Sequence, residues 1–362
     1  MTRRTLNLYL TRKFAVWLTI TSLAFLALAI LGDYLEMVKL AGRFGQSNLD
    51  ALYYTSLRLP MVFLDFAAFI FLFGTVLCLI RLSQAQELVV IRSAGVSVWQ
   101  FLTPFLLTAF LIGSLLVAII EPLGTSSFKA FRAIEDELAG RKVEVQLSKS
   151  GVWLREATPN GSFILRGGEV GDLENQRLRQ ITVLMFDAEG VFTHRLKAKT
   201  ANLKAGAWQL KNVEILVTGQ AVEKRKSMRL TSQLDTNTLA QKFYPPKTIN
   251  IWQLGGYIET AQAAGSDTTR HEVRFHSLLT LPFMLAAMVL LAACFSLPTG
   301  RIISASATMG LAVLSGFGLY IGADFVARLG ELQVLPPIIA SWTPSLIAGL
   351  LAVSYLLKAE DG

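Results

Sequence analysis

Six long apolar stretches dominate the pattern of hydrophobic and polar positions along the chain. Each has 18 to 20 residues and at most one charge, and together they cover Phe14–Leu31, Met61–Ile80, Phe101–Ile120, Leu278–Leu297, Ile302–Ile321 and Ile338–Leu357. A bilayer hydrocarbon core about 30 Å thick is spanned by roughly 20 helical residues. Within lipid, a helix satisfies its own backbone hydrogen bonds. The pattern therefore predicts six transmembrane helices, three on each side of a polar region.

Between the third and fourth stretches, apolar and polar residues begin to alternate. Segments such as VEVQLS, SFILRG and QITVLMFD show this alternation, and turn sequences such as TPNG and DAEG separate them. A period of two residues indicates strands with one buried face. About eight such segments fit a small antiparallel sandwich, a jelly roll or an open barrel. SSFKAFRAIEDELAGRK before the strands predicts a helix leaving the membrane, and YPPKTINIWQLGG after them predicts a connector back to it.

The predicted fold class is therefore an α-helical membrane protein with six transmembrane helices and an inserted all-β domain. We place the three regions at residues 1–122, 123–275 and 276–362. The composition agrees, because 52% hydrophobic residues and a mean hydropathy of +0.48 exclude a soluble globular protein. GDYLEM follows the first apolar stretch without a small-residue cleavage site. The first helix is therefore predicted to be retained rather than removed as a signal peptide.

Lysine and arginine are unevenly distributed between the two sides of the predicted spans. Cytoplasmic segments of membrane proteins carry an excess of these residues. If the N-terminus is inside, eight lie near the cytoplasmic ends: Arg3, Arg4, Arg12, Lys13, Arg81, Arg92, Arg301 and Lys358. The short outer segments then hold four: Lys39, Arg43, Arg58 and Arg328. We therefore predict that both termini are cytoplasmic and that the β-domain lies on the opposite side.

The net charge of +8 lies mainly in the polar region. Residues 122–276 hold 22 Lys and Arg against 16 Asp and Glu, an excess of six. A basic domain beside a membrane favours anionic lipid headgroups over nucleic acid as a partner. Cys78 and Cys294 lie within apolar stretches, and the sequence has no disulfide framework, zinc spacing or CxxC pattern.

The sequence contains no recognisable catalytic motif. It lacks GxxxxGK[ST], GxSxG and HExxH, and its three histidines, His194, His271 and His276, are scattered. We predict that the chain is not an enzyme and holds no metal. Among the ionisable residues near the spans, Lys39, Asp65 and Asp324 remain candidates for function, because a charge within the bilayer needs a partner or a wet cavity. Solvation at the interface is the simpler explanation for most of the others.

The segment QAQELVVIRSAGVSVWQ, residues 84–100, lies between two apolar stretches and is too short and too charged to span a bilayer. On a helical wheel one arc of about 120° has Arg92 at its edge. That arc holds Glu87, Leu88, Ile91, Ala94 and Gly95, whereas Val89, Val90 and Ser93 occupy the other side.

This segment is predicted to form a separate surface helix at about residues 84–97. Gly95 suits the end of a short helix, and Ser97 with Gln100 resembles a capping box before the next span. A helix resting on lipid headgroups is the alternative, but anionic lipid would favour a row of basic residues instead of Glu87. A socket on a cytoplasmic protein fits better, and burying Leu88 and Ile91 there stabilises the contact by roughly 1.5–3 kcal/mol each at most.

Three stretches resemble a known family of bacterial permeases. QELVVIRSAGVS at 86–97 is similar to that family's coupling helix, LQVLPPIIASWTPSLI at 332–347 to the approach to its last span, and DYLEMVKLAG at 33–42 to the end of its first helix. With the layout of three helices, β-domain and three helices, the chain resembles the lipopolysaccharide-export permeases of the LptF/LptG family over essentially its whole length. It is more similar to the LptG branch. The resemblance implies a jelly roll for the β-domain.

The resemblance also implies a transport function with several partners. A permease of this kind pairs with a second, LptF-like permease on an LptB-like ATPase dimer, with an LptC-like bitopic protein alongside. It extracts lipopolysaccharide from the inner membrane of a Gram-negative bacterium. Its periplasmic β-domain then joins an LptA-like bridge toward the outer membrane. Because the ATPase binds the ATP, no cofactor is expected in this chain.

Two sets of residues follow from the resemblance. Glu87 matches the family's acidic docking residue, and the predicted ATPase-docking set is Glu87, Leu88, Ile91, Arg92, Ala94 and Gly95. Lys39 matches a basic residue that contacts lipid phosphates. Asp33 and Leu40 stand where some relatives have lysine, so Arg43 and Arg132 are candidates to compensate. The predicted lipid-binding set is Lys39, Arg43, Arg132 and Asp324.

Two other functions stay open on the sequence alone. An ABC-type permease for another envelope lipid or lipoprotein would share this layout, and a different associated ATPase would favour it. A membrane receptor with a periplasmic β sensor domain would bind a ligand tightly and show no dependence on ATP. A membrane enzyme comes last, because no activated nucleophile or metal set is visible.

Overall fold

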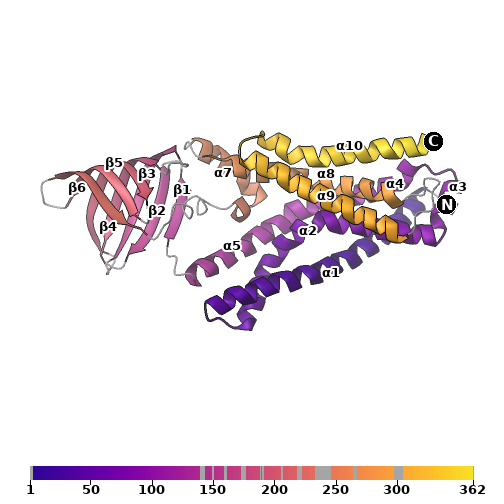
Figure 1. Cartoon of the computed structure of the whole chain (residues 1–362), viewed down its shortest axis with the longest axis horizontal. Coiled ribbons are helices and arrows are strands. Elements are labelled where there is room, and N and C mark those ends of the chain that lie inside the picture. The colour runs from indigo at the N-terminus through magenta and orange to yellow at the C-terminus, as the bar shows by residue number, and fades with distance from the viewer. Residues whose placement is uncertain are drawn as a thin grey trace. The chain divides into compact units, whose positions relative to one another are not determined.

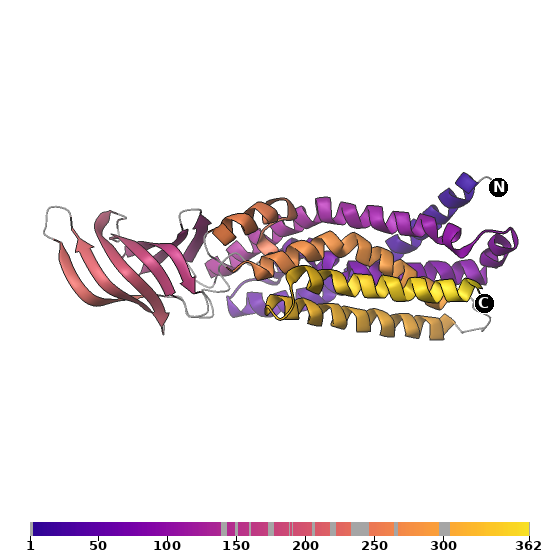
Figure 2. The same cartoon turned by 90° about the horizontal axis from the view of Figure 1, so that it is seen from above.

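The structure is a computed structural model with two compact units (Figure 1, Figure 2). It describes residues 3–138, 143–148, 151–158, 161–172, 177–187, 189, 191–204, 207–217, 222–232, 246–263, 267–296 and 305–361. The helical unit comprises Met1–Phe128 and Glu272–Gly362, and the β-unit comprises Lys129–His271.

The helical unit contains six helices that are long and apolar enough to cross a membrane. Before the β-sheet come α1 (Arg3–Arg43), α2 (Asn48–Gln84), the short α3 (Glu87–Ser93), α4 (Val98–Leu115), the π-helical segment η1 (Leu116–Ile120) and α5 (Glu121–Leu138). After it come α8 (Thr269–Ser296), α9 (Ala305–Glu331) and α10 (Pro337–Asp361). The six predicted spans are confirmed. Leu297, Arg301 and 302–304 of the prediction lie outside the described residues.

The two ends of the chain lie at the same end of the helical unit. In both views the start of α1, the short helix α3 and the last turns of α10 are found together there (Figure 1, Figure 2). The end of α1 and the start of α2 lie at the opposite end. Six crossings produce this arrangement, because an even number of spans returns the chain to the side where it started.

Close packing in the helical unit depends on aromatic rings and on glycine. Phe14 of α1 lies 4.8 Å from Phe105 of α4 and 6.3 Å from Phe71 of α2, measured between ring centroids, and all three are buried. Gly113 of α4 lies against Pro282 of α8, where an added Cβ would come within 2.8 Å of the proline Cα. Helices in lipid associate largely through such close contacts at small residues.

The helix that follows α3 is interrupted by a π turn. Regular α-helix ends at Leu115, η1 covers Leu116–Ile120, and α5 begins at Glu121 and continues into the β-unit. A π turn closes its hydrogen bonds over one residue more than an α turn. Glu121, the first residue after it, is fully buried.

The β-unit contains a seven-stranded antiparallel sheet among its described residues. Its strands are β1 (Val143–Ser148), β2 (Gly151–Thr158), β3 (Gly161–Asp172), β4 (Arg177–Phe186), β5 (Phe192–Lys204), β6 (Ala207–Leu216) and β7 (Glu223–Thr231). The inserted all-β domain is thereby confirmed. Each described strand pairs with its neighbours in the chain, which is an open up-and-down sheet; the Greek-key connections of a jelly roll do not occur among them.

One face of the sheet forms the core of the β-unit. Trp208 and Leu210 of β6 are buried and alternate with exposed residues. At Asn212, whose φ is +52°, the alternation shifts by one position, and Val213 and Ile215 are then the buried residues. The 3-10 turn η2 (Pro246–Thr248) and helix α7 (Ile251–Ala263) follow the strands.

Candidate docking helix and charged sites

The short helix α3 is separated from its neighbours by distinct backbone breaks. Gln86 has a left-handed backbone with φ of +58° between α2 and α3. After α3, Gly95 has φ of +80°, a region in which glycine carries no steric cost. The Ser97 hydroxyl then accepts a hydrogen bond of 3.3 Å from the Gln100 N–H at the start of α4. These breaks keep α3 as a helix of its own between two spans.

The structure places part of the predicted docking face against the chain's own core. Leu88 is 2% exposed and belongs to the core of the helical unit, and Ile91 packs against that core. Both side chains therefore face the chain's own spans in this structure, where they offer no surface to a partner. Val89 and Val90, which the wheel assigned to the other side, are 56% and 65% exposed.

The surface that α3 offers to a partner is therefore different from the predicted arc. Arg92, Ala94 and Gly95 of the predicted set are exposed. We define the exposed side of α3 by its solvent-accessible residues, which are Val89, Val90, Arg92, Ser93 and Ala94. Two adjacent exposed valines beside an arginine make a small apolar patch with a positive edge.

Glu87 is held by two residues from the beginning of α1. The Tyr9 hydroxyl donates a hydrogen bond of 2.7 Å to Oε2 of Glu87, and Lys13 Nζ lies 3.7 Å from Oε1. The Lys13 ammonium also lies 5.3 Å from the centroid of the Tyr9 ring. The Glu87 side chain stays 28% exposed. This cluster could not be predicted from the sequence, because Glu87 lies 78 residues from Tyr9 in the chain.

The predicted lipid-binding residues belong to three helices, α1, α5 and α9. Lys39 and Arg43 are exposed near the end of α1, and within the described residues no ion pair involves either of them. Asp324 forms an ion pair of 2.8 Å with Arg328 one turn along α9. Arg132 belongs to the β-unit and forms an ion pair of 2.8 Å with Glu135 of its own helix.

Arg58 joins α2 to the acidic residues of α1. Its Nη2 lies 3.2 Å from Oδ1 of Asp33 and 3.6 Å from Oε2 of Glu36, and Asp33 is buried. The two carboxylates offset the charge of Arg58. Arg58 therefore joins two helices rather than offering its charge to a ligand. Asp33 therefore has a role in helix packing.

A second buried ion pair lies between α5 and α8. Arg274 Nη2 donates to Oε1 of Glu121 at 2.8 Å, and the Thr125 hydroxyl donates to the same oxygen at 2.9 Å. The Glu121 side chain is 0% exposed and that of Arg274 is 13% exposed. No motif or spacing in the sequence connects Glu121 with Arg274, which lies 153 residues further along the chain.

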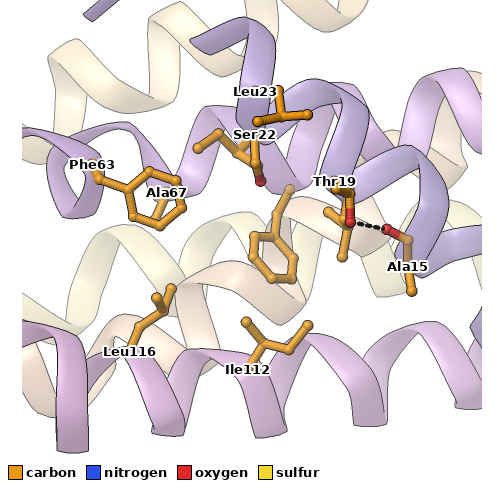
Figure 3. A pocket seen from close by; sticks show the side chains of 11 residues that line it. Ala15, Thr19, Ser22, Leu23, Phe63, Ala67, Ile112 and Leu116 are labelled. Atoms are coloured by element: carbon orange, nitrogen blue, oxygen red, sulfur yellow. Dashed lines mark hydrogen bonds between the residues drawn. The ribbon is translucent and has the colours of Figure 1, made fainter. Parts of the chain in front are cut away.

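A cavity of about 270 Å³ lies between α1, α2 and α4 (Figure 3). Its walls include Leu23 from α1, Phe63 from α2, and Ile112 and Leu116 from α4 and η1. The Thr19 hydroxyl on this wall already donates to the Ala15 carbonyl of its own helix at 2.9 Å. The cavity is therefore largely apolar and suits hydrocarbon, and none of the predicted site residues lines it.

Comparison with known proteins identifies the family of this chain. Residues 8–358 match the family described as lipopolysaccharide export system permease LptF/LptG. The chain belongs to this family. It is 24% identical over 357 residues to the lipopolysaccharide export system permease protein LptG of Escherichia coli strain K12, covering 95% of this chain and 96% of the relative.

A second relative extends the comparison to nearly every residue. The lipopolysaccharide export system permease protein LptG of Haemophilus influenzae is 23% identical over 371 residues, covering 99% of both chains. The resemblance to the LptF/LptG family is confirmed, and the relatives carry the LptG name that the sequence favoured. A multi-pass permease with an inserted β-domain is therefore the architecture of this family member.

Proposed function

We propose that this chain is the non-catalytic permease subunit of an ABC transporter that extracts lipopolysaccharide from the inner membrane of a Gram-negative bacterium. The family match across residues 8–358 carries the proposal. The substrate then passes to a periplasmic bridge, with which the β-unit connects. ATP is bound and hydrolysed by a separate partner, so the chain itself needs no cofactor.

The exposed side of α3 is the proposed docking surface for the ATPase. It lies at the end of the helical unit that also holds both chain ends (Figure 1), which the distribution of Lys and Arg assigns to the cytoplasm. Val89 and Val90 offer apolar area, with the Arg92 charge beside them. Glu87 lies at the edge of this surface with its side chain partly exposed. A groove on an LptB-like ATPase dimer is the proposed partner.

Lys39 and Arg43 are the proposed contacts for the lipid's phosphates. Both are exposed cations at the opposite end of the helical unit from α3. Within the described residues they take part in no ion pair, unlike Arg58 with its two carboxylates. Arg132 and Asp324 each form a local pair, so a phosphate at Arg132 would compete with Glu135.

The other proposed partners complete the transporter. A second, LptF-like permease faces this one in the membrane, and an LptC-like bitopic protein and an LptA-like bridge continue the path across the periplasm. Both termini are then cytoplasmic and the β-unit is periplasmic. These assignments follow the family and the asymmetry of basic residues.

Copurification of the ATPase tests the docking surface. Val90→Glu places a charge on the apolar patch, and Val191→Glu is the matched control, because Val191 is 61% exposed in the β-unit. We expect the first variant and Glu87→Lys to lose the copurified ATPase, and the control to retain it. Retention of the ATPase by both test variants would exclude α3 as the docking helix.

Crosslinking tests the lipid contact. A photoreactive residue at Lys39 is expected to form an adduct with lipopolysaccharide in cells, whereas the same residue at Leu49, an exposed position on α2, is the control. A chain that folds and assembles but forms no adduct at Lys39 would contradict the proposed substrate contact. An adduct with another envelope lipid would favour a different cargo.

A further inference from the structure

We propose that Tyr9 and Lys13 are positioning residues that connect the docking helix α3 to the first span. In this arrangement Glu87 does more than approach a partner, because its carboxylate also fastens α3 to α1. Movement of α3 then reaches α1 directly. This inference rests on the proposed function, since it assumes that α3 receives movement from an ATPase.

The geometry of the contact supports a directed connection. Tyr9 and Lys13 are four residues apart on α1, so both side chains lie on one face of that helix. The hydroxyl of Tyr9 binds one carboxylate oxygen of Glu87 at 2.7 Å, and the ammonium of Lys13 lies 3.7 Å from the other. Two donors on two oxygens restrict the rotation of the carboxylate as well as its position.

Chain connectivity explains why a side-chain link is needed. The backbone joins α3 to α2 through Ala85 and Gln86 and to α4 through 94–97, whereas Tyr9 of α1 lies 78 residues before Glu87 in the chain. A displacement of α3 therefore reaches α2 and α4 through the backbone, but it reaches α1 only through packed side chains. Among these contacts, those of Glu87 with Tyr9 and Lys13 are polar and directional.

The remaining contact of α3 with the core has a different character. Leu88 lies in the same buried cluster as Leu10 and Phe14 of α1. Apolar packing of this kind keeps α3 against the spans, but it is non-directional, so it does not select one rotation of the helix. The hydrogen bond from Tyr9 and the ion pair with Lys13 favour one rotation of α3. Glu87 is also the first residue of α3, so its carboxylate orients the helix at its beginning.

The test uses the complete transporter, with the second permease and the ATPase, in proteoliposomes that contain lipopolysaccharide. The measured quantity is lipopolysaccharide released per ATP hydrolysed. Tyr9→Phe removes only the hydroxyl, and Lys13→Met removes only the charge at similar length. The controls are Arg12→Met, which removes an exposed charge beside Lys13, and Tyr355→Phe near the end of α10.

We expect Tyr9→Phe and Lys13→Met each to lower the release per ATP by about fivefold or more, the lower range for coupling between protein sites. Both controls should match the wild type, and Lys13→Arg should retain coupling because it restores a cation beside Glu87. Tyr9→Phe combined with Glu87→Gln should release no less lipopolysaccharide per ATP than whichever single variant couples less well. Both changes act on the same hydrogen bond between Tyr9 and Glu87, so their effects should not add. Unchanged release per ATP in Tyr9→Phe and Lys13→Met would overturn the proposal.

Failure of this inference is distinct from failure of the proposed function. If Glu87→Lys loses the ATPase while Tyr9→Phe and Lys13→Met couple normally, the docking role stands and the link to α1 is refuted. If the wild-type transporter releases no lipopolysaccharide, the proposed function itself fails. If Lys13→Arg uncouples as strongly as Lys13→Met, a charge-mediated link is also refuted.

Discussion

The buried ion pair between Glu121 and Arg274 gives a quantitative prediction. The carboxylate is 0% exposed and accepts hydrogen bonds from Arg274 at 2.8 Å and Thr125 at 2.9 Å. Removing one member of a buried pair leaves an uncompensated charge, which costs about 3–5 kcal/mol, whereas replacing both members by neutral residues of similar volume is often neutral. Arg274→Met should therefore lower the free energy of unfolding by about 3–5 kcal/mol.

A double-mutant cycle tests this reasoning. The full chain is unfolded in detergent for the wild type, Arg274→Met, Glu121→Gln and the double variant, and the free energies are compared. We expect the double variant to be more stable than Arg274→Met, because no buried carboxylate is left without its partner. The reasoning is refuted if Arg274→Met lies within about 1 kcal/mol of the wild type, or if the two single effects simply add.

Three further predictions concern backbone space and core packing. Gly113→Ala should lower the free energy of unfolding by about 1–3 kcal/mol, because the new methyl group would meet the Pro282 backbone at 2.8 Å; Gly310→Ala, with open space around it, is the control in the same detergent assay and should be neutral or stabilising. Gly95→Ala should lower it by about 1–2 kcal/mol, because φ is +80° there; a loss no larger than that of Gly310→Ala would contradict the assigned backbone. Trp208→Ala should cost about 3–5 kcal/mol in the thermal unfolding of the β-unit within the full chain. Trp208→Phe should cost much less, because the buried indole N–H has no hydrogen-bond partner among the described residues; equal losses would contradict this.

The architecture could be read from the sequence because its signals are local. Each span is a continuous apolar stretch, and each strand shows its own alternation, so no long-range information was needed. The order of the strands is a different matter. Alternation marks the buried face of a strand but not its neighbours, so an open up-and-down sheet and a jelly roll produce similar patterns.

The face of α3 could not be decided from the sequence for a related reason. The wheel of this seven-residue helix has two aliphatic residues on each side, Leu88 and Ile91 against Val89 and Val90. Periodicity alone does not say which side faces the spans and which faces outward. The structure decides it, because Leu88 is buried in the core that α1 and α2 supply.

The charged contacts were missed because they join distant parts of the chain. Tyr9 and Glu87 are 78 residues apart, and Glu121 and Arg274 are 153 residues apart. No spacing rule connects such pairs, since their proximity depends on how the helices pack. The sequence singled out Glu87, but its partners became visible only when α1 was placed beside α3.

The π turn η1 makes the number of residues in the third span important for the position of the side chains that follow it. Each helical residue advances about 100° around the axis, so the extra residue in this turn sets the direction in which the side chains at the start of α5 point. Exchanging one apolar side chain there for another leaves that direction unchanged. Deleting one residue would convert the turn to α-helix and rotate Glu121 away from Arg274. This stretch therefore tolerates substitutions far better than it tolerates a change in the number of its residues.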